Sequence, residues 1–577
     1  MRKLKAIFGR TLLTASVLLS VLPASNLIQA QDISYREEIH IHHDGPVYLT
    51  GDRLRFSVTC LDQSNHLLSP LSRLAYVELL DSENTPLAQS IIDLNDGKGK
   101  GDILLPFTAT SGNYILRAYT KWMRNFPPED YAYSIVTIIN PFKSLGLSES
   151  SEKPATRKVS APTAGLTIST ASEVYRSRQK VTIDLGLTGV EGRPASGLVS
   201  VSVSKVPDFF MTGQGNSGKL PVVVKKKPSQ ASFKPDRHYL PETKGQFLTG
   251  KVYESGTTTP KANELIYLSI IGTQPEFYTS KADSEGVIRF EIVDFYGQGE
   301  AHLQSGDPDA NVDIIIDPSF SEAFVALEVP SLSIDEKWES YLTQASQNMQ
   351  VRNVYSSIIP FDEHQPSGDS LPFYGIPDQK YYLDDYTRFP LMEEVLREYV
   401  AGIFPRKRND EFYFKMVNVE KNEIMNNEPL MLYDGFPIKK ANTIMELDPR
   451  LVKRIDVVTK RYLMGGAIFD GITSFHSYKG DLAGLDPALI AGQDYSFIGV
   501  QKGAKYVFPD YDDANSTSTL PDFRNTLYWA DSKEISNGLG VVAFFAGDDT
   551  GTYLIDVEGI SDSGDLISQK KFFKVEK

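Results

Sequence analysis

Short runs in which apolar and polar residues alternate fill residues 37–142. Within residues 54–61, the positions 54, 56, 58 and 60 carry Leu, Phe, Val and Cys and would share one face of a strand. Turn-forming residues separate the runs, at Gly45-Pro46, Gly51-Asp52, Asn95-Asp96-Gly97 and Ser111-Gly112-Asn113. Short strands with a turn about every ten residues predict an antiparallel β-sandwich over residues 31–142.

The same alternation continues further along the chain. Residues 180–185 and 198–204 read as strands of a second sandwich over residues 166–240, which ends in a polar, Gly-rich loop. A third sandwich over residues 245–330 is implied by a family resemblance of residues 246–290, given below. Residues 143–165 have the Ser, Lys, Pro and Thr content of a linker, and residues 331–380 read as a partly helical connector.

The period of the pattern changes in residues 385–480. Apolar residues at 391, 392, 395, 396, 399 and 400 predict a helix that Gly402 ends. Strands are expected at 412–419, 429–433 and 452–458, with a short helix at 443–447, so this segment is a small α+β domain. Residues 481–577 read as another sandwich-like segment. The 58 residues from Leu520 are marginal for an independent sandwich, which leaves its completion by strands from elsewhere open.

One motif in the α+β segment points to a known family. The run Leu430-Met431-Leu432-Tyr433-Asp434-Gly435-Phe436-Pro437-Ile438 is followed by Leu447-Asp448-Pro449 and Ile455-Asp456-Val457, and together they resemble the plug domain of TonB-dependent outer-membrane receptors. The resemblance implies a tight turn at Asp434-Gly435, against which a helix and a strand dock. It makes six residues structural parts of the motif: Asp434, Gly435, Pro437, Asp448, Pro449 and Ile455.

The sandwiches carry weaker resemblances. Residues 46–56 and 110–120 resemble motifs of the macroglobulin-like domains of the α2-macroglobulin superfamily, and residues 246–290 resemble a carboxypeptidase-regulatory-like sandwich. The receptors' 22-stranded barrel needs on the order of 220 residues in strands. Only 97 residues follow Gly480, so we expect a plug-like domain without its own barrel. The combination resembles modular exported proteins of the Bacteroidota and implies a protein partner, such as a separate barrel, at the outer membrane.

The N-terminus and the net charge indicate the cellular compartment and the classes of partner to expect. Basic residues in the first ten positions, an apolar run at 12–22 and Ala30 predict a cleavable signal peptide over residues 1–30, and hence an exported protein. The family resemblance implies that this protein resides in the periplasm, associated with the outer membrane. No other segment approaches 18 continuous apolar residues, so we expect no transmembrane segment in the mature chain. A formal charge of −15 argues against nucleic acid or an anionic lipid surface as the main partner.

Few residues suggest chemistry. Cys60 is the only cysteine, which excludes an intramolecular disulfide, and with Gln63 it has only the spacing of a macroglobulin thioester. The helical domain that carries the thioester in that family is missing here. His40 and His42 would share one strand face, a spacing compatible with a metal, with Asp44 as third ligand. An edge strand without a metal is the simpler interpretation, and we assign no metal ligand.

Three loops match binding motifs incompletely. Residues 213–219 satisfy a phosphate-loop pattern except at Leu220, and the acidic stretches 307–313 and 510–515 lack the glycine or the glutamate of a calcium loop. No nucleophile and base have recognisable spacing. We therefore predict a non-enzymatic binding or scaffold protein without a cofactor. The alternatives are a glycan- or peptide-binding accessory of nutrient uptake and a relative of the protease-inhibiting macroglobulins.

Overall fold

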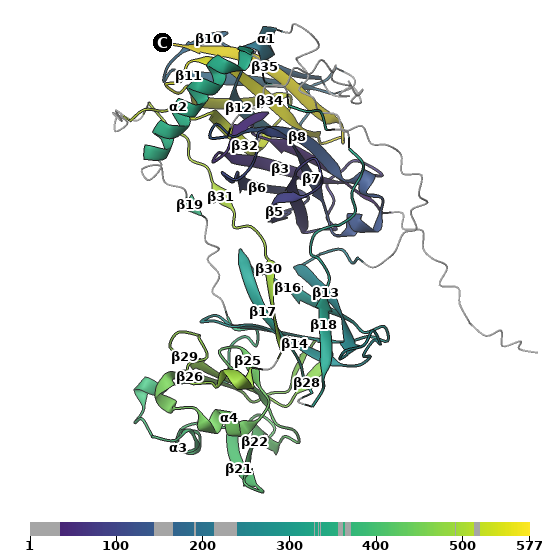
Figure 1. Ribbon diagram of the computed structural model, residues 1–577, viewed down its shortest axis with the longest axis vertical. Helices are drawn as coiled ribbons and strands as arrows, with labels where there is room; N and C mark the ends of the chain where they lie inside the picture. Colours follow the sequence, from purple (N-terminus) through teal and green to yellow (C-terminus); the bar gives the residue numbers. More distant parts are fainter. Residues whose placement is uncertain are drawn as a thin grey trace, which may run out of the picture.

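The structure is a computed structural model that describes residues 35–143, 165–189, 192–212, 239–307, 309–327, 329–332, 334, 336–355, 362–363, 371–490, 492–512 and 520–577. The expected signal peptide, most of the linker and the Gly-rich loop with its phosphate-loop pattern lie outside these residues. The described part is mainly β, with tandem sandwiches and one small α+β domain, which confirms the predicted fold class (Figure 1).

The first sandwich consists of two facing sheets. The smaller sheet has the order β1-β3-β6, and the larger has the order β2-β8-β7-β4-β5. The alternating pattern buries the Phe56 and Val58 side of β3 against Tyr76 and Leu116 of the larger sheet. Its strands are β1 (Glu37–His43), β2 (Val47–Leu49), β3 (Arg53–Asp62), β4 (Leu74–Leu80), β5 (Pro86–Asp93), β6 (Lys98–Leu104), β7 (Gly112–Tyr119) and β8 (Ala132–Ile139).

The second sandwich combines two segments that are far apart in sequence. One sheet has the order β10-β35-β34-β12-β32, and the other has the order β33-β11-β9. In Figure 1 the yellow C-terminal strands lie beside the blue strands of the earlier segment. The strands are β9 (Gly165–Thr170), β10 (Val174–Arg176), β11 (Lys180–Thr188), β12 (Gly197–Val206), β32 (Thr526–Ile535), β33 (Leu539–Phe545), β34 (Gly551–Ser561) and β35 (Leu566–Glu576).

This pairing joins the segments 166–240 and 481–577, which the predicted domain boundaries divide, and it completes the C-terminal segment with strands from elsewhere in the chain, an option that the sequence leaves open. Strand β12 pairs with β34 along its whole length, from Gly197 opposite Ser561 to Val206 opposite Thr552. Both segments also contribute to one hydrophobic core, in which Val201 and Ile555 are fully buried. Alternation identifies a strand but not its partner, so the sequence pattern could not reveal this pairing.

The third sandwich is inserted into the second one. Its sheets have the orders β16-β13-β18 and β15-β14-β17-β30, so its last strand comes from the segment 481–577 rather than from 245–330. The strands are β13 (Gln246–Glu254), β14 (Leu265–Ile270), β15 (Glu276–Lys281), β16 (Val287–Ile292), β17 (Gln298–Ser305), β18 (Val312–Ile316) and β30 (Gln493–Ile498). A connector contains α2 (Glu339–Tyr355), where Ala345 and Met349 pack on Ile139 of the first sandwich.

The α+β domain is inserted in turn into the third sandwich. Its main sheet has the order β20-β26-β29-β24-β25, and a second sheet has the order β21-β22-β23. The predicted helices and strands are confirmed within a few residues, as in β26, whose bounds are identical. Its elements are β20 (Gln379–Tyr382), α3 (Met392–Glu398), β21 (Ile403–Arg408), β22 (Glu411–Asn418), β23 (Glu423–Ile424), β24 (Leu430–Tyr433), β25 (Phe436–Ile438), α4 (Ala441–Glu446), η6 (Pro449–Leu451), β26 (Val452–Val458), β27 (Tyr462–Met464), β28 (Ala467–Phe469) and β29 (Ile472–Ser477).

Candidate functional site

The plug-like motif begins with a two-residue hairpin. Tyr433 pairs with Phe436, and between them Asp434 and Gly435 have φ values of 48° and 87°, the left-handed conformations that such a turn needs. The buried Asp434 carboxylate accepts hydrogen bonds from the backbone N–H groups of Ser477 at 2.7 Å and Leu482 at 3.0 Å. Asp434 and Gly435 therefore form the two-residue turn of this hairpin.

The same turn lies against the third sandwich. A methyl group added at Gly435 would come within 2.4 Å of Pro275 Cβ, and one at Gly480 would come within 2.2 Å of the carbonyl carbon of Gly272. The Asp434 carbonyl also accepts a hydrogen bond from the Gly272 N–H at 3.4 Å. The Asp-Gly turn is thus a contact between two domains, and not a loop open to a partner.

The other motif residues are also structural. Pro437 is buried in the edge strand β25, where a residue without an N–H can be accommodated. Asp448 caps η6 by accepting a hydrogen bond from the Arg450 N–H at 2.9 Å, and Pro449 occupies the first helical position. Ile455 is fully buried in the core of the domain. The structure places all six predicted residues in one domain, without a chemical grouping among them.

His42 lies at the junction of the first and second sandwiches. Its side chain is 7% exposed, and its Nδ1 is 2.5 Å from Ser200 Oγ of β12. The imidazole also packs on the Trp529 ring of β32, with 5.4 Å between the ring centroids. His40, two residues earlier, is partly exposed, and its Nε2 lies 3.2 Å from Glu38 Oε1. The β1 face predicted to carry both histidines therefore faces the second sandwich.

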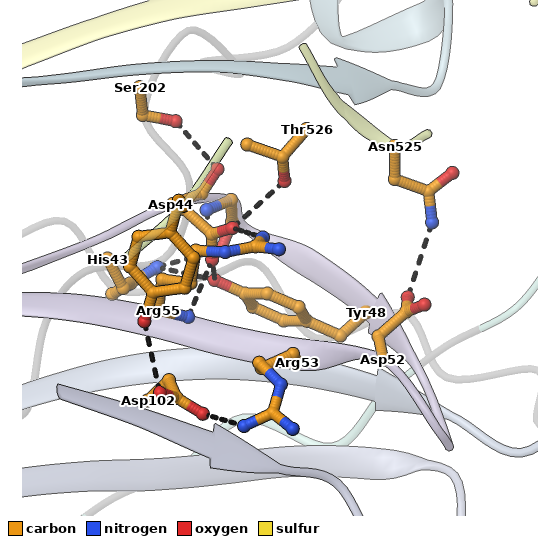
Figure 2. Close-up of polar contacts among 12 residues, drawn as sticks. His43, Asp44, Tyr48, Asp52, Arg53, Arg55, Asp102, Ser202, Asn525 and Thr526 are labelled. Atoms are coloured by element: carbon orange, nitrogen blue, oxygen red, sulfur yellow. Dashed lines mark hydrogen bonds and ion pairs between the residues drawn. The ribbon is translucent and has the colours of Figure 1, made fainter. Parts of the chain in front are cut away.

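Asp44 is not available as the third metal ligand that the sequence suggested. Its buried carboxylate accepts hydrogen bonds from Arg55 Nη1 at 2.8 Å, Tyr48 Oη at 2.9 Å and Thr526 Oγ1 at 2.9 Å (Figure 2). Ser202 of β12 donates to the Asp44 carbonyl at 2.6 Å. Burial, and then the Asp44 charge, raise the pKa of Tyr48. Asp44 instead joins the two sandwiches through Thr526 and Ser202.

The carboxylates of Asp556 and Glu558, both in β34, face His42 in place of Asp44. One ligand atom from each of His42, Asp556 and Glu558 lies within 4.8 Å of the others, and no second group of three such side chains occurs among the described residues. Lys570 Nζ lies 2.5 Å from Asp556 Oδ2. Burial raises the pKa of Asp556, but the charge and hydrogen bond of Lys570 together with the neighbouring His42 and His43 outweigh burial, and the pKa is lowered. Burial, followed by the Asp556 charge, raises the pKa of Glu558 to about 7.

Sequence reasoning missed these carboxylates. The only signal was the two-residue spacing of Asp556 and Glu558 in an otherwise apolar strand, which resembles a solvent-facing strand side. In the structure that side is largely covered by β1 of the first sandwich, and Asp556 and Glu558 are only partly exposed. Burial also lowers the pKa of His42 to about 4, so the imidazole is neutral at pH 7.

A polar cavity of about 370 Å³ adjoins this group. Glu558 and Ser200 line it from the second sandwich, while Lys98 and Lys100 line it from β6 of the first. Burial lowers the pKa of Lys98. A cavity with fixed charges of both signs suits water, an ion or a small polar ligand, and it gives a route from the surface to Glu558.

The remaining candidate residues do not form a cluster of catalytic or metal-binding side chains within the described part of the chain. Cys60 is fully buried in β3, and burial raises its pKa well above the usual thiol value, which disfavours a reactive thiolate. In the acidic stretch 307–313, Asp313 accepts hydrogen bonds from Ser255 and Gly256. In the stretch 510–515, Asp512 pairs with Lys180, and residues 513–515 lie outside the described residues. No helix among the described residues has the length and apolar content of a membrane span.

Comparison with known proteins gives a weak structural likeness. No family model and no curated protein sequence matches the chain. The solved structures that align include α-2-macroglobulin from Salmonella, with 9% identity over 94% of this chain and a TM-score of 0.24. Two further structures are of α-2-macroglobulin from Escherichia coli. The trypsin-activated protein has 8% identity and a TM-score of 0.23, and the native conformation has 8% identity and a TM-score of 0.24. Each aligns over 94% of this chain. The chain spans 40%, 41% and 40% of these three proteins, respectively.

Proposed function

We propose that this chain is a non-enzymatic, exported binding or scaffold protein at the outer membrane, and that its α+β domain engages a separate outer-membrane barrel protein. The plug-like motif and the signal-like N-terminus support the proposal. The observation that carries it is an exposed, partly apolar sheet face at the far end of the α+β domain. This face is called the outer face below.

The outer face belongs to the sheet β21-β22-β23. Phe404 of β21 lies opposite Lys415 of β22, and Ile424 of β23 lies opposite Val417. Residues directly opposite each other share a sheet face, as do residues two apart, so these four side chains lie on one face. Phe404 is 44% exposed and Ile424 is 69% exposed. The opposite face, with Phe414, is buried in the core of the domain.

The arrangement of the domains suits presentation of this face. The α+β domain shares a hydrophobic cluster with the third sandwich, in which Phe277 packs with Leu432 and Phe469. The Asp-Gly turn lies on that attached side. In Figure 1 β21 and β22 are at the end of the chain's fold farthest from the first two sandwiches. An apolar patch with neighbouring basic side chains fits a protein surface, where buried apolar area supplies affinity and charge supplies orientation.

Co-purification tests the proposal. The tagged mature chain is expressed in its native host, outer membranes are solubilised in mild detergent, and captured proteins are identified by mass spectrometry. We expect an outer-membrane barrel protein in stoichiometric amount, and a Phe404→Asp/Ile424→Asp double variant should lose at least 90% of it.

Leu463→Asp is the matched control, because Leu463 is 69% exposed on the β27–β28 hairpin of the same domain. This variant should keep the partner. The proposal fails if the wild-type chain is recovered only as a soluble protein without a barrel partner, or if the double variant captures the barrel as well as Leu463→Asp does.

A second candidate function has its own observation. An open cavity of about 990 Å³ lies between β5 of the first sandwich and β30 of the third. Phe324 and Tyr495 line it together with the amide side chains of Gln89 and Gln298. Aromatic rings beside amides suit a glycan or an extended peptide. Calorimetric titration with oligosaccharide and peptide libraries tests this function, and Tyr495→Ala should weaken any binding found; no binding from either library refutes it.

A further inference from the structure

The hydrogen bonds of Ser200 determine which nitrogen of His42 carries the proton. The Ser200 hydroxyl donates its single hydrogen to the Glu558 carbonyl oxygen at 3.1 Å. With that hydrogen on the Glu558 carbonyl, the 2.5 Å contact between Ser200 Oγ and His42 Nδ1 is satisfied by the tautomer that carries its hydrogen on Nδ1. In the neutral ring the other nitrogen, Nε2, then carries a lone pair and no hydrogen.

That lone pair faces other electron-rich atoms. His42 Nε2 is 4.0 Å from Asp556 Oδ2 and has no hydrogen-bond partner in this structure. Asp556 Oδ1 is likewise buried without a hydrogen-bond partner, while Lys570 occupies only Oδ2. Buried polar atoms normally have a hydrogen-bond partner. His42 Nε2 carries no hydrogen in this tautomer, so it cannot donate a hydrogen bond to either carboxylate. A cation between these atoms would resolve the conflict.

We propose that His42, Asp556 and Glu558 form a binding site for a divalent transition-metal ion of the zinc type, which ties the first sandwich to the second. The donor set consists of one imidazole nitrogen and two carboxylates, which zinc accepts. Glu558 also lines the 370 Å³ cavity, from which a water could supply a fourth ligand. The Nδ1–H···Ser200 bond is the outer hydrogen bond that orients a metal-bound histidine.

The distances are compatible with this assignment. Ligand atoms around a tetrahedral zinc lie roughly 3.3 Å apart. The three ligand atoms lie within 4.8 Å of one another, so they need to approach by up to about 1.5 Å. The Asp556 oxygen 4.0 Å from His42 Nε2 is Oδ2, which also accepts from Lys570 Nζ, so an ion would either share Oδ2 with Lys570 or take Oδ1, which has no hydrogen-bond partner. The rival explanation is a proton on the Glu558 carboxyl, shared with His42 Nε2, without any metal.

Zinc binding to the purified mature chain distinguishes these explanations. The chain is stripped with EDTA, desalted and titrated with ZnCl₂ by calorimetry, and Co²⁺ serves as a visible-absorption probe of the same site. We expect one ion per chain, a rise in Tm with zinc and a cobalt d–d band. His42→Asn keeps an amide N–H near the Nδ1 position but removes Nε2, and Glu558→Gln keeps the side-chain shape; each should weaken binding at least tenfold.

His302→Asn is the matched control, because His302 is a buried histidine of the third sandwich whose Nδ1 contacts Asp494 at 2.8 Å. This variant should bind zinc as the wild type does. Binding of less than half an equivalent to the wild type, no rise in its Tm, or equal affinity in His42→Asn would overturn the proposal. The wild-type measurements decide the question even if both site variants fail to fold.

Discussion

Replacing Gly435 with alanine tests whether the plug-like turn holds two domains together. Gly435 has a φ of 87°, and an added Cβ would lie 2.4 Å from Pro275 Cβ of the third sandwich. The substitution therefore has two costs. A left-handed conformation costs a residue with a Cβ about 1–2 kcal/mol, and forcing a methyl group into a packed contact costs about 1–3 kcal/mol.

Gly375→Ala separates these two costs. Gly375 belongs to the same domain segment and has a φ of 73°, but an added Cβ would meet nothing within 4 Å. This variant should lose only the conformational part. The difference between the two variants, about 1–3 kcal/mol, is the cost of forcing the methyl group into the contact between the domains.

Hydrogen exchange measured by mass spectrometry is the suitable assay, because unfolding of a chain with several domains has no single free energy. Peptides covering 430–438 and 272–281 should exchange roughly 5- to 150-fold faster in Gly435→Ala than in Gly375→Ala, since 1.4 kcal/mol corresponds to tenfold. Equal exchange in the two variants, or faster exchange in 430–438 alone, would show that the turn does not stabilise the domain contact.

Three further predictions concern buried polar groups. Asp44→Asn should destabilise the first and second sandwiches by about 3–5 kcal/mol, since it leaves the partly buried Arg55 without its fully buried counter-charge. Asp531→Asn, at the more exposed pair with Lys100, should cost less than about 1 kcal/mol, and differential calorimetry compares the two variants. Asp456 has a lowered pKa because His476 and neighbouring groups outweigh its burial. Its contribution to stability is therefore present above the unfolded pKa of about 3.9 and is lost as the pH falls through the lower folded pKa. Asp456→Asn should remove this acid-dependent loss of stability in thermal melts between pH 2 and 5. Cys60 should react with a thiol reagent only in denaturant, and rapid labelling of the native chain would contradict its burial.

The sequence predicted individual elements more accurately than their partners. The helix that begins near residue 391 and the strand at 452–458 have strong local periodicity, and both are present. The Asp434-Gly435 hairpin was also predictable, because positive φ at two successive residues favours this dipeptide. That the turn packs on Pro275 was not predictable, since a contact across about 160 residues leaves no local pattern.

The side-chain contacts at the junction of the first and second sandwiches were equally unpredictable from the sequence. In β12 the residues Val199, Val201 and Val203 alternate with Ser200, Ser202 and Ser204, a pattern typical of a strand with one side in water. The serine side is in fact buried against the first sandwich. Only the fold shows that these serines orient His42 and Asp44, and that Asp556 rather than Asp44 faces the imidazole.

The nested order of the chain explains why the junction combines residues from both ends of the sequence. The innermost α+β domain is continuous from 371 to 490, whereas the second sandwich needs β12 and then β34, about 350 residues later. Closing so long a loop is tolerable, because its entropic cost grows only with the logarithm of its length. Strand β34 lies between β12 and β35, so this sheet stays incomplete until the last strands pair. His42 from the first strand meets Asp556 and Glu558 only then, and a metal bound by these three side chains would therefore stabilise the completed arrangement of both sandwiches over any partly folded form.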